Sequence, residues 1–346
     1  RIESAFVGTA FPGHFTRQEC AVGQLVLRQL GITGIPVMRV ENACASGSSA
    51  LREAWISVAS GLVDVALAFG VEKLSNVPTS EVMSIFSYAS DYEAEGSAGI
   101  IFPGVFAMIA QAYMHEYGVR PEQLAEVSVK NHRHGFENPR AQRKLLLTVE
   151  DVQKAKMVCD PLTSMHCCPI SDGAAAVVLV SESVAREVGR GQIRLAAVGL
   201  ATGDYDAERP LTTFPSTRRA AEQAYRLAGV GPEDIKVAEV HDCFSVAELV
   251  HLEDLGFCER GDAAKVTSQG ETTIGGRLPV NTSGGLLSKG HPVGATGIAQ
   301  VVELTEQLRG HSGPRQVEGA NVGLAMCMGG FMFGDGCAAT VTILHR

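Results

Sequence analysis

A nearly continuous apolar run between two glycines, Gly61–Gly70, constrains the fold of this chain more than any other segment. It lacks the polar–apolar alternation of a half-exposed strand, so it predicts a strand buried on both faces. Ala45–Ser60, just before it, has its apolar side chains on one side of a helix, and Ala174–Val180 reads as a second buried strand. Strands buried on both faces need helices above and below them, which predicts an α/β fold.

The second half of the chain repeats this plan. Further strands are expected at Ile193–Gly199, Ile235–Val240 and Ala338–Leu344, and further helices at Thr217–Ala228 and Pro292–Leu308. In both halves a strand leads through a polar or glycine-rich turn into a helix of small residues and then into another strand, which indicates an internal duplication. We therefore predict two halves, 1–188 and 189–346, with an inserted loop subdomain at 72–169.

Composition excludes several classes of function. The net charge of −9 argues against broad binding to nucleic acid or to anionic membranes. The longest apolar stretch, 98–110, is too short for insertion into a membrane. The nine cysteines form no C-x-x-C pair, which favours a reducing compartment, the cytoplasm, over a disulfide framework. The chain opens directly in a strand-like segment, Ile2–Ala10, so we expect an N-terminal segment to be missing, and organelle targeting stays open.

Cys44 lies in a run of small residues, Val40–Ser49, at the expected start of a helix. Helix N-termini carry unpaired N–H groups and about half a positive charge, which favour a thiolate over a thiol. The small neighbours leave room for a substrate carbonyl. The segment by itself fits a nucleophilic cysteine and a buried structural cysteine equally well.

Three further segments combine glycines or a strand end with reactive side chains: His241–Phe244, Gly284–Gly297 and Met326–Gly330. A nucleophilic cysteine needs a base, an oxyanion site and often a second acid or base. His291 can be the base, and Cys327 can exchange a proton with a substrate carbon. The Gly329 N–H and His241 can bind oxyanions. Taken singly, His241 and Cys327 fit a structural role better than a chemical one.

No metal site is expected. His166, Cys167 and Cys168 are adjacent, and adjacent ligands rarely suit one ion. The remaining cysteines are expected to be packing residues: Cys20, Cys159, Cys243, Cys258 and Cys337. The basic segment from Lys130 to Lys144 predicts a solvated face, with contact to a ligand phosphate as the alternative.

In this order, the four reactive segments resemble the thiolase superfamily, and most closely its thiolase branch. Val40–Ser49 is similar to the family's nucleophile segment, Gly290–Gly297 to its Gly-His-Pro motif and Met326–Gly330 to its Cys-x-Gly motif. The resemblance covers essentially the whole chain, although the first segment of a typical member has no counterpart here. It implies a five-layer αβαβα fold built from the two duplicated halves.

The resemblance also implies a chemistry, which is CoA-dependent cleavage of a 3-oxoacyl-CoA, or the reverse Claisen condensation, through an acyl-enzyme on Cys44. His291 would assist Cys44, and Cys327 would protonate the departing carbanion. One oxyanion site is expected from His241 and the other from the backbone N–H groups of Cys44 and Gly329. No permanently bound cofactor is expected, because CoA acts as a cosubstrate.

The family's partners enter in the same way. Contacts with CoA are expected at Arg133, Arg140, Arg143 and Ser283. Members of the family are dimers or larger, and some chains of this branch work with a small zinc-ribbon/OB-fold subunit. Two alternatives stay open: a C-acyltransferase or condensing enzyme with a non-CoA acceptor, and a scaffold subunit of a thiolase complex.

Two segments depart from the family pattern. His241–Phe244 reads His-Asp-Cys-Phe where many thiolases carry Asn-Glu-x-Phe. The His form is similar to sterol-carrier-protein-type thiolases and their bacterial relatives, and it leaves substrate size and reaction direction open. The bulky run Phe331–Gly336 stands where the family usually continues with glycine, and we expect it to reshape the acyl pocket.

Overall fold

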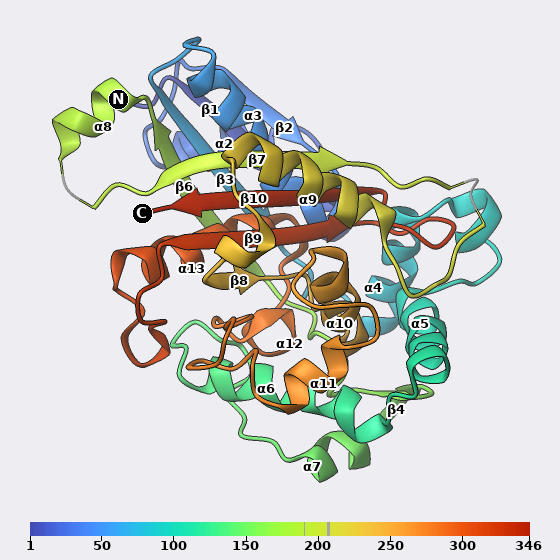
Figure 1. Ribbon diagram of the computed structural model, residues 1–346. Helices are drawn as coiled ribbons and strands as arrows, with labels where there is room; N and C mark the ends of the chain where they lie inside the picture. The colour runs from blue at the N-terminus through green and yellow to red at the C-terminus, as the bar shows by residue number, and fades with distance from the viewer. Residues whose placement is uncertain (190, 206–207) are drawn as a thin grey trace.

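Two four-stranded sheets form the frame of the residues that the computed structural model describes, 1–189, 191–205 and 208–346 (Figure 1). The first sheet has the order β2-β1-β3-β6, in which β6 alone is antiparallel. The second has the order β7-β10-β9-β8, in which β10 is antiparallel to both of its neighbours. The strands are β1 Ser4–Gly8, β2 Val37–Val40, β3 Val65–Glu72, β6 Gly173–Val180, β7 Arg194–Ala201, β8 Val237–Glu239, β9 Val322–Gly329 and β10 Ala338–His345.

Helices and sheets alternate in five layers, as the family resemblance implied. Helix α2 (Val22–Gln29) packs on β1 and β2 at the outside of the first sheet, and α3 (Ser46–Ala59) packs on the other face of that sheet. Helix α13 (Thr296–Arg309) lies beside α3 and contacts β8 and β9 of the second sheet. Helix α9 (Pro215–Ala228) crosses β7 and β10 on the face of the second sheet that points away from α13 (Figure 1). The two central helices therefore separate the sheets.

These central helices share a local design that supports an internal duplication. A three-residue 3-10 turn, η1 (Ala43–Ala45), leads directly into the 14 residues of α3. The turn η5 (Val293–Ala295) leads in the same way into the 14 residues of α13. We expected one helix over Pro292–Leu308, but the first turn is 3-10 and the α-helix begins at Thr296. The exact limits of the two halves stay a prediction.

The two strands expected to be buried differ in exposure. Residues Ala66–Gly70 of β3 are buried, as predicted. Strand β6 is present, but the prediction that it is buried is wrong, because all of its residues are half-buried or exposed and Val178 is 55% exposed. Among the described residues, β6 pairs with β3 alone, so the outer edge of β6 is open. A groove of about 980 Å³ runs along that edge, between β6, α3 and α13, and none of the candidate residues lines it.

The segment 72–169, which we predict to be an insertion, is mainly helical and packs against the second half. Helix α6 (Pro121–Phe136) contacts α10 (Ser245–Asp254), α11 (Ala263–Ser268) and α12 (Gly285–Lys289), and α5 (Phe102–Tyr117) contacts α10. Apolar residues of α5 and α6 belong to the same core cluster as those of α10, β9 and β10, so the insertion shares a core with the second half. The elements concerned are α4 Thr79–Phe86, η2 Ser87–Ala89, η3 Tyr92–Gly96, α5 Phe102–Tyr117, α6 Pro121–Phe136, α7 Val149–Lys154, β4 Met157–Cys159 and β5 Leu162–Thr163.

The remaining elements are shorter helices and 3-10 turns, among which α10 is fully buried. None of the helices in the described part of the chain has the length and apolar character needed to cross a bilayer. The connecting elements are α1 Pro12–Thr16, α8 Glu182–Val188, η4 Pro232–Asp234, α10 Ser245–Asp254, α11 Ala263–Ser268, α12 Gly285–Lys289 and η6 Gly313–Arg315.

Candidate active site

Cys44 lies in the turn η1, between the end of β2 and the start of α3. Ala43 before it has a left-handed backbone (φ 46°), which is uncommon for a residue other than glycine and turns the chain sharply at this point. The Ser46 hydroxyl accepts from the Asn42 N–H at 3.0 Å and donates to the Ala43 carbonyl at 2.6 Å. The small residues of this segment thus allow a tight turn that holds Cys44 at the beginning of the central layer.

His291 comes from the second half, between Gly290 and Pro292. Its Nδ1 lies 2.7 Å from the Thr296 hydroxyl, and that hydroxyl also lies 3.1 Å from the Pro292 carbonyl. Because a hydroxyl has one proton and the carbonyl can only accept, Thr296 donates to Pro292 and accepts from the Nδ1–H of His291. The imidazole is therefore held as the tautomer whose Nε2 carries a free lone pair.

The structure brings the four predicted side chains together from both halves of the chain. One nitrogen each of His241 and His291 and the sulfur of Cys44 all lie within 4.8 Å of one another. The sulfur of Cys327 lies 3.5 Å from His241 Nδ1 and 3.2 Å from the Cys44 carbonyl oxygen. The rings of His241 and His291 meet edge to face, with their centroids 5.0 Å apart.

Burial sets the protonation of these groups. Desolvation raises the pKa of Cys44 to about 12 and lowers the pKa of His241 to about 3. It also raises the pKa of Cys327 and lowers that of His291. Without a ligand, both thiols are therefore protonated and both imidazoles neutral at pH 7. The expected thiolate at Cys44 is not the resting state, because the cost of desolvating a thiolate outweighs its stabilisation by the N–H groups at the start of the helix.

A backbone N–H does reach the Cys44 sulfur. It belongs to Gly330, and it lowers the pKa of the thiol against the larger effect of burial. The sequence named the neighbouring Gly329 for an oxyanion site. Gly329 lies tightly against the nucleophile segment, since a Cβ on it would fall 1.9 Å from the Asn42 carbonyl oxygen. The Gly-Gly pair at the end of β9 is thus in direct contact with the turn that carries Cys44.

The sulfur and the two imidazoles also form a set that a soft divalent metal accepts. The absence of a metal from the chemistry stays a prediction. The adjacent residues His166 and Cys167 are engaged elsewhere, since His166 Nδ1 lies 2.8 Å from the Ser245 hydroxyl and the Cys167 thiol donates to the Thr163 carbonyl at 3.3 Å. Cys20 is exposed, so the prediction that it packs in the interior is wrong.

The basic segment is not one solvated face, as its composition indicated. Lys130, His132 and His134 are buried, and the Lys130 ammonium lies 2.6 Å from the Glu248 carboxylate. The segment reaches the interior because α6 packs against α10, α11 and α12. Only part of it therefore remains open to a ligand.

The four residues expected to contact CoA lie in different surroundings. Arg133 is exposed, whereas Arg140 donates to both carboxylate oxygens of Glu306 at 2.6 Å. Arg143 donates to the carbonyls of Ser164 and Cys167. Ser283 is fully buried, and its N–H and hydroxyl both donate to Glu239.

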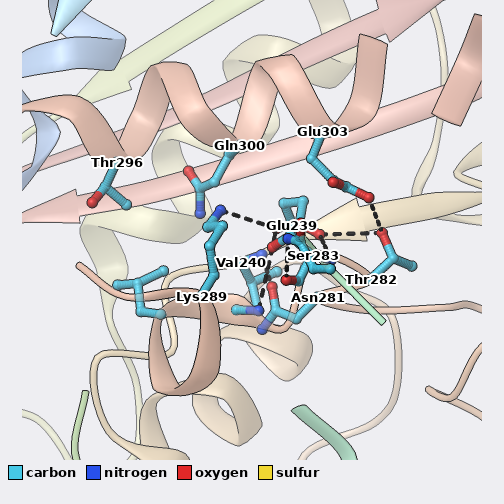
Figure 2. A network of polar contacts seen from close by, with 12 residues as sticks. Glu239, Val240, Asn281, Thr282, Ser283, Lys289, Thr296, Gln300 and Glu303 are labelled. Atoms are coloured by element: carbon cyan, nitrogen blue, oxygen red, sulfur yellow. Dashed lines mark hydrogen bonds and ion pairs between the residues drawn. The ribbon is translucent and has the colours of Figure 1, made fainter. Parts of the chain in front are cut away.

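Ser283 belongs to a buried polar network that sequence reasoning missed (Figure 2). The Thr282 hydroxyl lies 3.3 Å from Glu239 and 3.2 Å from Glu303, and the Lys289 ammonium lies 3.7 Å from Glu239. The network fixes the segment that runs from β8 towards His291. The signal was a carboxylate inside the apolar strand pattern Ile235–Val240, because a charge is rarely fully buried unless it is paired.

Comparison with known families matches both halves of the chain. The description "Thiolase, N-terminal domain" matches residues 2–183, and "Thiolase C-terminal domain-like" matches residues 200–346.

Individual relatives agree with these matches. An acetyl-CoA acetyltransferase of Methanothermobacter thermautotrophicus is 44% identical, over 100% of this chain and 89% of its own. The benzoylsuccinyl-CoA thiolase subunit BbsB of Thauera aromatica is 39% identical, over 92% of this chain and 81% of its own. Human sterol carrier protein 2 is 36% identical, over 95% of this chain and 62% of its own.

Solved structures show the same architecture. A structure described as Ltp2-ChsH2(DUF35) aldolase has a TM-score of 0.84 and 27% identity, and the match covers 100% of this chain and 87% of that one. A monomeric SCP2-thiolase-like protein of Mycobacterium smegmatis has a TM-score of 0.73 over 99% of this chain and 67% of that one, and at 18% identity it supports the fold alone. With family matches to both halves and a relative 44% identical over the whole chain, this protein belongs to the thiolase family.

Proposed function

We propose that this chain is a CoA-dependent thiolase that cleaves a 3-oxoacyl-CoA, or runs the reverse condensation, through an acyl-enzyme on Cys44. The observation that carries the proposal is the meeting of Cys44 from the first half with His241 and His291 from the second, within 4.8 Å. A sulfur, a neutral base with a free lone pair and a second thiol are the groups that such a two-step acyl transfer needs.

In the first step, the Cys44 sulfur attacks the keto carbon as its proton passes to Nε2 of His291. Since the resting thiol is protonated, proton transfer accompanies attack and does not precede it. The charge that develops on the substrate oxygen needs hydrogen-bond donors, and the N–H groups of Cys44, Gly329 and Gly330 are the ones at hand. His241 would serve the second carbonyl.

In the second step, the bond between the α and β carbons breaks and leaves an acyl thioester on Cys44. The electron pair stays on the departing acetyl-CoA carbon, and Cys327 supplies the proton for it. CoA then attacks the thioester and leaves as acyl-CoA, and its thiol proton restores the site. Dividing the reaction into a carbon–carbon cleavage that forms the Cys44 thioester and a thioester exchange with CoA is the advantage of covalent catalysis.

For the CoA contacts, the surroundings favour some of the predicted residues over others. Arg133 is exposed, and Arg143 donates only to carbonyl oxygens, so each keeps its charge for a phosphate. Arg140 would first have to leave Glu306. Ser283 is fully buried in the network of Figure 2, so we retain only the arginines as proposed contacts.

Two variants test the proposal. Cys44→Ser should fold, with a melting temperature close to that of the parent chain, and lose thiolysis of 3-oxoacyl-CoA. Cys327→Ala should still take an acyl group from a simple thioester but fail to break or form the carbon–carbon bond. Full thiolysis by either variant would reassign that residue.

A second candidate function is that of an aldolase with the same fold and a partner subunit. The solved relative named as an aldolase contains a DUF35 protein, and the Thauera relative is named as a subunit. An aldolase cleaves a carbon–carbon bond without using CoA as an acyl acceptor. A condensing enzyme with another acceptor likewise does not consume free CoA. Consumption of free CoA together with a 3-oxoacyl-CoA distinguishes a thiolase from both.

The same two names support a partner subunit for this chain. A small zinc-ribbon/OB-fold subunit, and self-association as a dimer or larger, stay predictions from the family resemblance. A scaffold without activity would not need an accessible nucleophile. Iodoacetamide should therefore label Cys44, and prior incubation with acyl-CoA should block the labelling. For the compartment, the nine unpaired cysteines support the cytoplasm.

A further inference from the structure

Glu72, the last residue of β3, is a buried carboxylate that none of the steps above uses. One of its oxygens accepts from the Ala10 N–H at 2.8 Å and from the Gly294 N–H at 2.9 Å. The other accepts from the Thr9 hydroxyl at 3.0 Å and from the Phe11 N–H at 3.4 Å. The carboxylate is therefore fully engaged by four donors from two segments, Thr9–Phe11 and the turn at Gly294. A charged acceptor gives such hydrogen bonds about twice the usual strength.

Three of these donors come from the first half, but Gly294 lies in η5, three residues after His291. The seam between the halves is made of backbone in direct contact at this point. A Cβ on Gly70 would fall 2.3 Å from the Gly294 carbonyl oxygen, and one on Gly47 would fall 2.5 Å from the same atom. The backbones of the two halves touch here, and the Glu72 carboxylate bridges them by accepting the Gly294 N–H.

Further contacts tether the His291 loop to the first half, among them a β-bridge between Ile170 and His291. The backbone N–H of His291 donates to the Ser171 hydroxyl at 2.8 Å, and that hydroxyl donates to Gln142 at 2.5 Å. Glu72 thus holds the loop after the imidazole, and Ser171 holds it at the imidazole. Both hold a residue of the second half against the half that carries Cys44.

We propose that Glu72 is a positioning residue that fixes His291 opposite Cys44 by accepting the Gly294 N–H across the seam between the two halves. The inference rests on the proposed function for its effect on turnover. A shift of about 1 Å in a reacting group can cost about 100-fold in rate, so loss of this anchor should act mainly on kcat.

The charge of Glu72 gives the role a signature that packing alone would not produce. Glu72 and Glu41 are the two carboxylates whose charge opposes ionisation of Cys44 and raises the pKa of its thiol. Removing the charge of Glu72 should therefore make the sulfur easier to ionise while the imidazole becomes less well placed. Alkylation of Cys44 and turnover should change in opposite directions.

The experiment compares three variants of the full chain by melting temperature, by thiolysis of acetoacetyl-CoA and by the pH profile of Cys44 alkylation with iodoacetamide. Glu72→Gln removes the charge and points its amide NH2 either at the Ala10 and Gly294 N–H groups or at the Phe11 N–H and the Thr9 hydroxyl, so at least one N–H donor loses its acceptor. Glu72→Asp keeps the charge but is too short to reach Gly294. Glu3→Gln is the matched control, since Glu3 accepts the N–H groups of Asp64 and Val65 at the opposite end of the same strand.

For Glu72→Gln we expect a folded protein with kcat about 10- to 100-fold lower, KM within about 3-fold, and an alkylation profile moved to lower pH. Glu72→Asp should lose kcat with an unchanged profile, and Glu3→Gln should match the parent chain in both. Parental turnover with an unchanged profile in Glu72→Gln overturns the inference. A parent chain without thiolysis would refute the proposed function. Alkylation needs no thiolase substrate, so the alkylation profiles would still test the inference about Glu72.

Discussion

Among single residues, Cys44 shows how burial competes with local backbone polarity. The sequence placed it at the start of a helix, where a thiolate is favoured. In the structure it lies in a 3-10 turn, and desolvation raises the pKa of its thiol to about 12 despite the Gly330 N–H. In the proposed mechanism, the protonated Cys44 thiol and the neutral His291 form a resting pair that ionises only as the substrate is attacked.

Alkylation of Cys44 tests this resting state. Because the thiol pKa is raised, the thiolate fraction should grow about tenfold for each unit of pH between 7 and 10, without a plateau in that range. The measurement is the rate of iodoacetamide labelling of the Cys44 peptide, followed by mass spectrometry. The exposed Cys20 is the internal reference for the reactivity of the reagent. A plateau for Cys44 near pH 7 would show that the backbone N–H groups around its sulfur lower the thiol pKa more than desolvation raises it.

The sequence predicted the four central side chains but not the groups that hold them. Cys44, His291, Cys327 and His241 lie in motifs whose order resembles a known family. Glu72 is a single carboxylate at the end of an apolar strand, and nothing in its sequence neighbours indicates that Gly294, more than 200 positions away, donates to it. Long-range hydrogen bonds of this kind have no local pattern.

Among elements, the paired units η1–α3 and η5–α13 carry the site. Each begins with a 3-10 turn, and each turn is packed against backbone from the opposite half. The sequence predicted the helices but not the 3-10 turns, because small residues permit either geometry and the close contact across the seam decides between them.

Gly329→Ala tests how much this close contact matters. The added methyl would fall 1.9 Å from the Asn42 carbonyl oxygen and 2.6 Å from the Ala45 nitrogen, so β9 and η1 must separate. We expect the unfolding free energy to drop by about 1–3 kcal/mol and thiolysis to fall by at least about tenfold. Gly104→Ala, in α5, is the control, because its nearest neighbour is the Ile101 Cγ1 at 3.9 Å. Equal stability and activity in the two variants would contradict the account of the seam.

For the whole molecule, the α/β class and the five layers were predicted and are confirmed. The class followed from buried strands alternating with helices, and the layers from the family resemblance. The exposure of β6 was not predictable from its composition, since an edge strand and a central strand can have the same apolar residues. The packing of segment 72–169 on the second half was likewise not predictable, because the apolar residues of a helix do not indicate which other element it packs against.

Stability as a function of pH depends on the buried neutral histidines. Burial lowers the pKa of His132 to about 4, against an ordinary value of 6.5. A lowered pKa means that the unfolded chain binds the proton first, so this contribution is present above pH 6.5 and is lost as pH falls towards 4.

His132→Gln removes that titration. The difference in unfolding free energy between the parent chain and the variant should therefore shrink by about 2 kcal/mol between pH 6.5 and pH 5. Urea unfolding at the two pH values measures it. The same substitution at the exposed His14 is the control for replacing a histidine outside the interior. A constant difference between the parent chain and His132→Gln would mean that the His132 imidazole is not desolvated.

The central claim is that the sulfur of the first half carries the acyl group while the second half supplies the proton chemistry. The most direct measurement is peptide mass mapping of Cys327→Ala after incubation with acetyl-CoA. We predict one acetyl group, on the peptide that contains Cys44. An acetyl group on another cysteine, or none on a folded protein, would contradict the account.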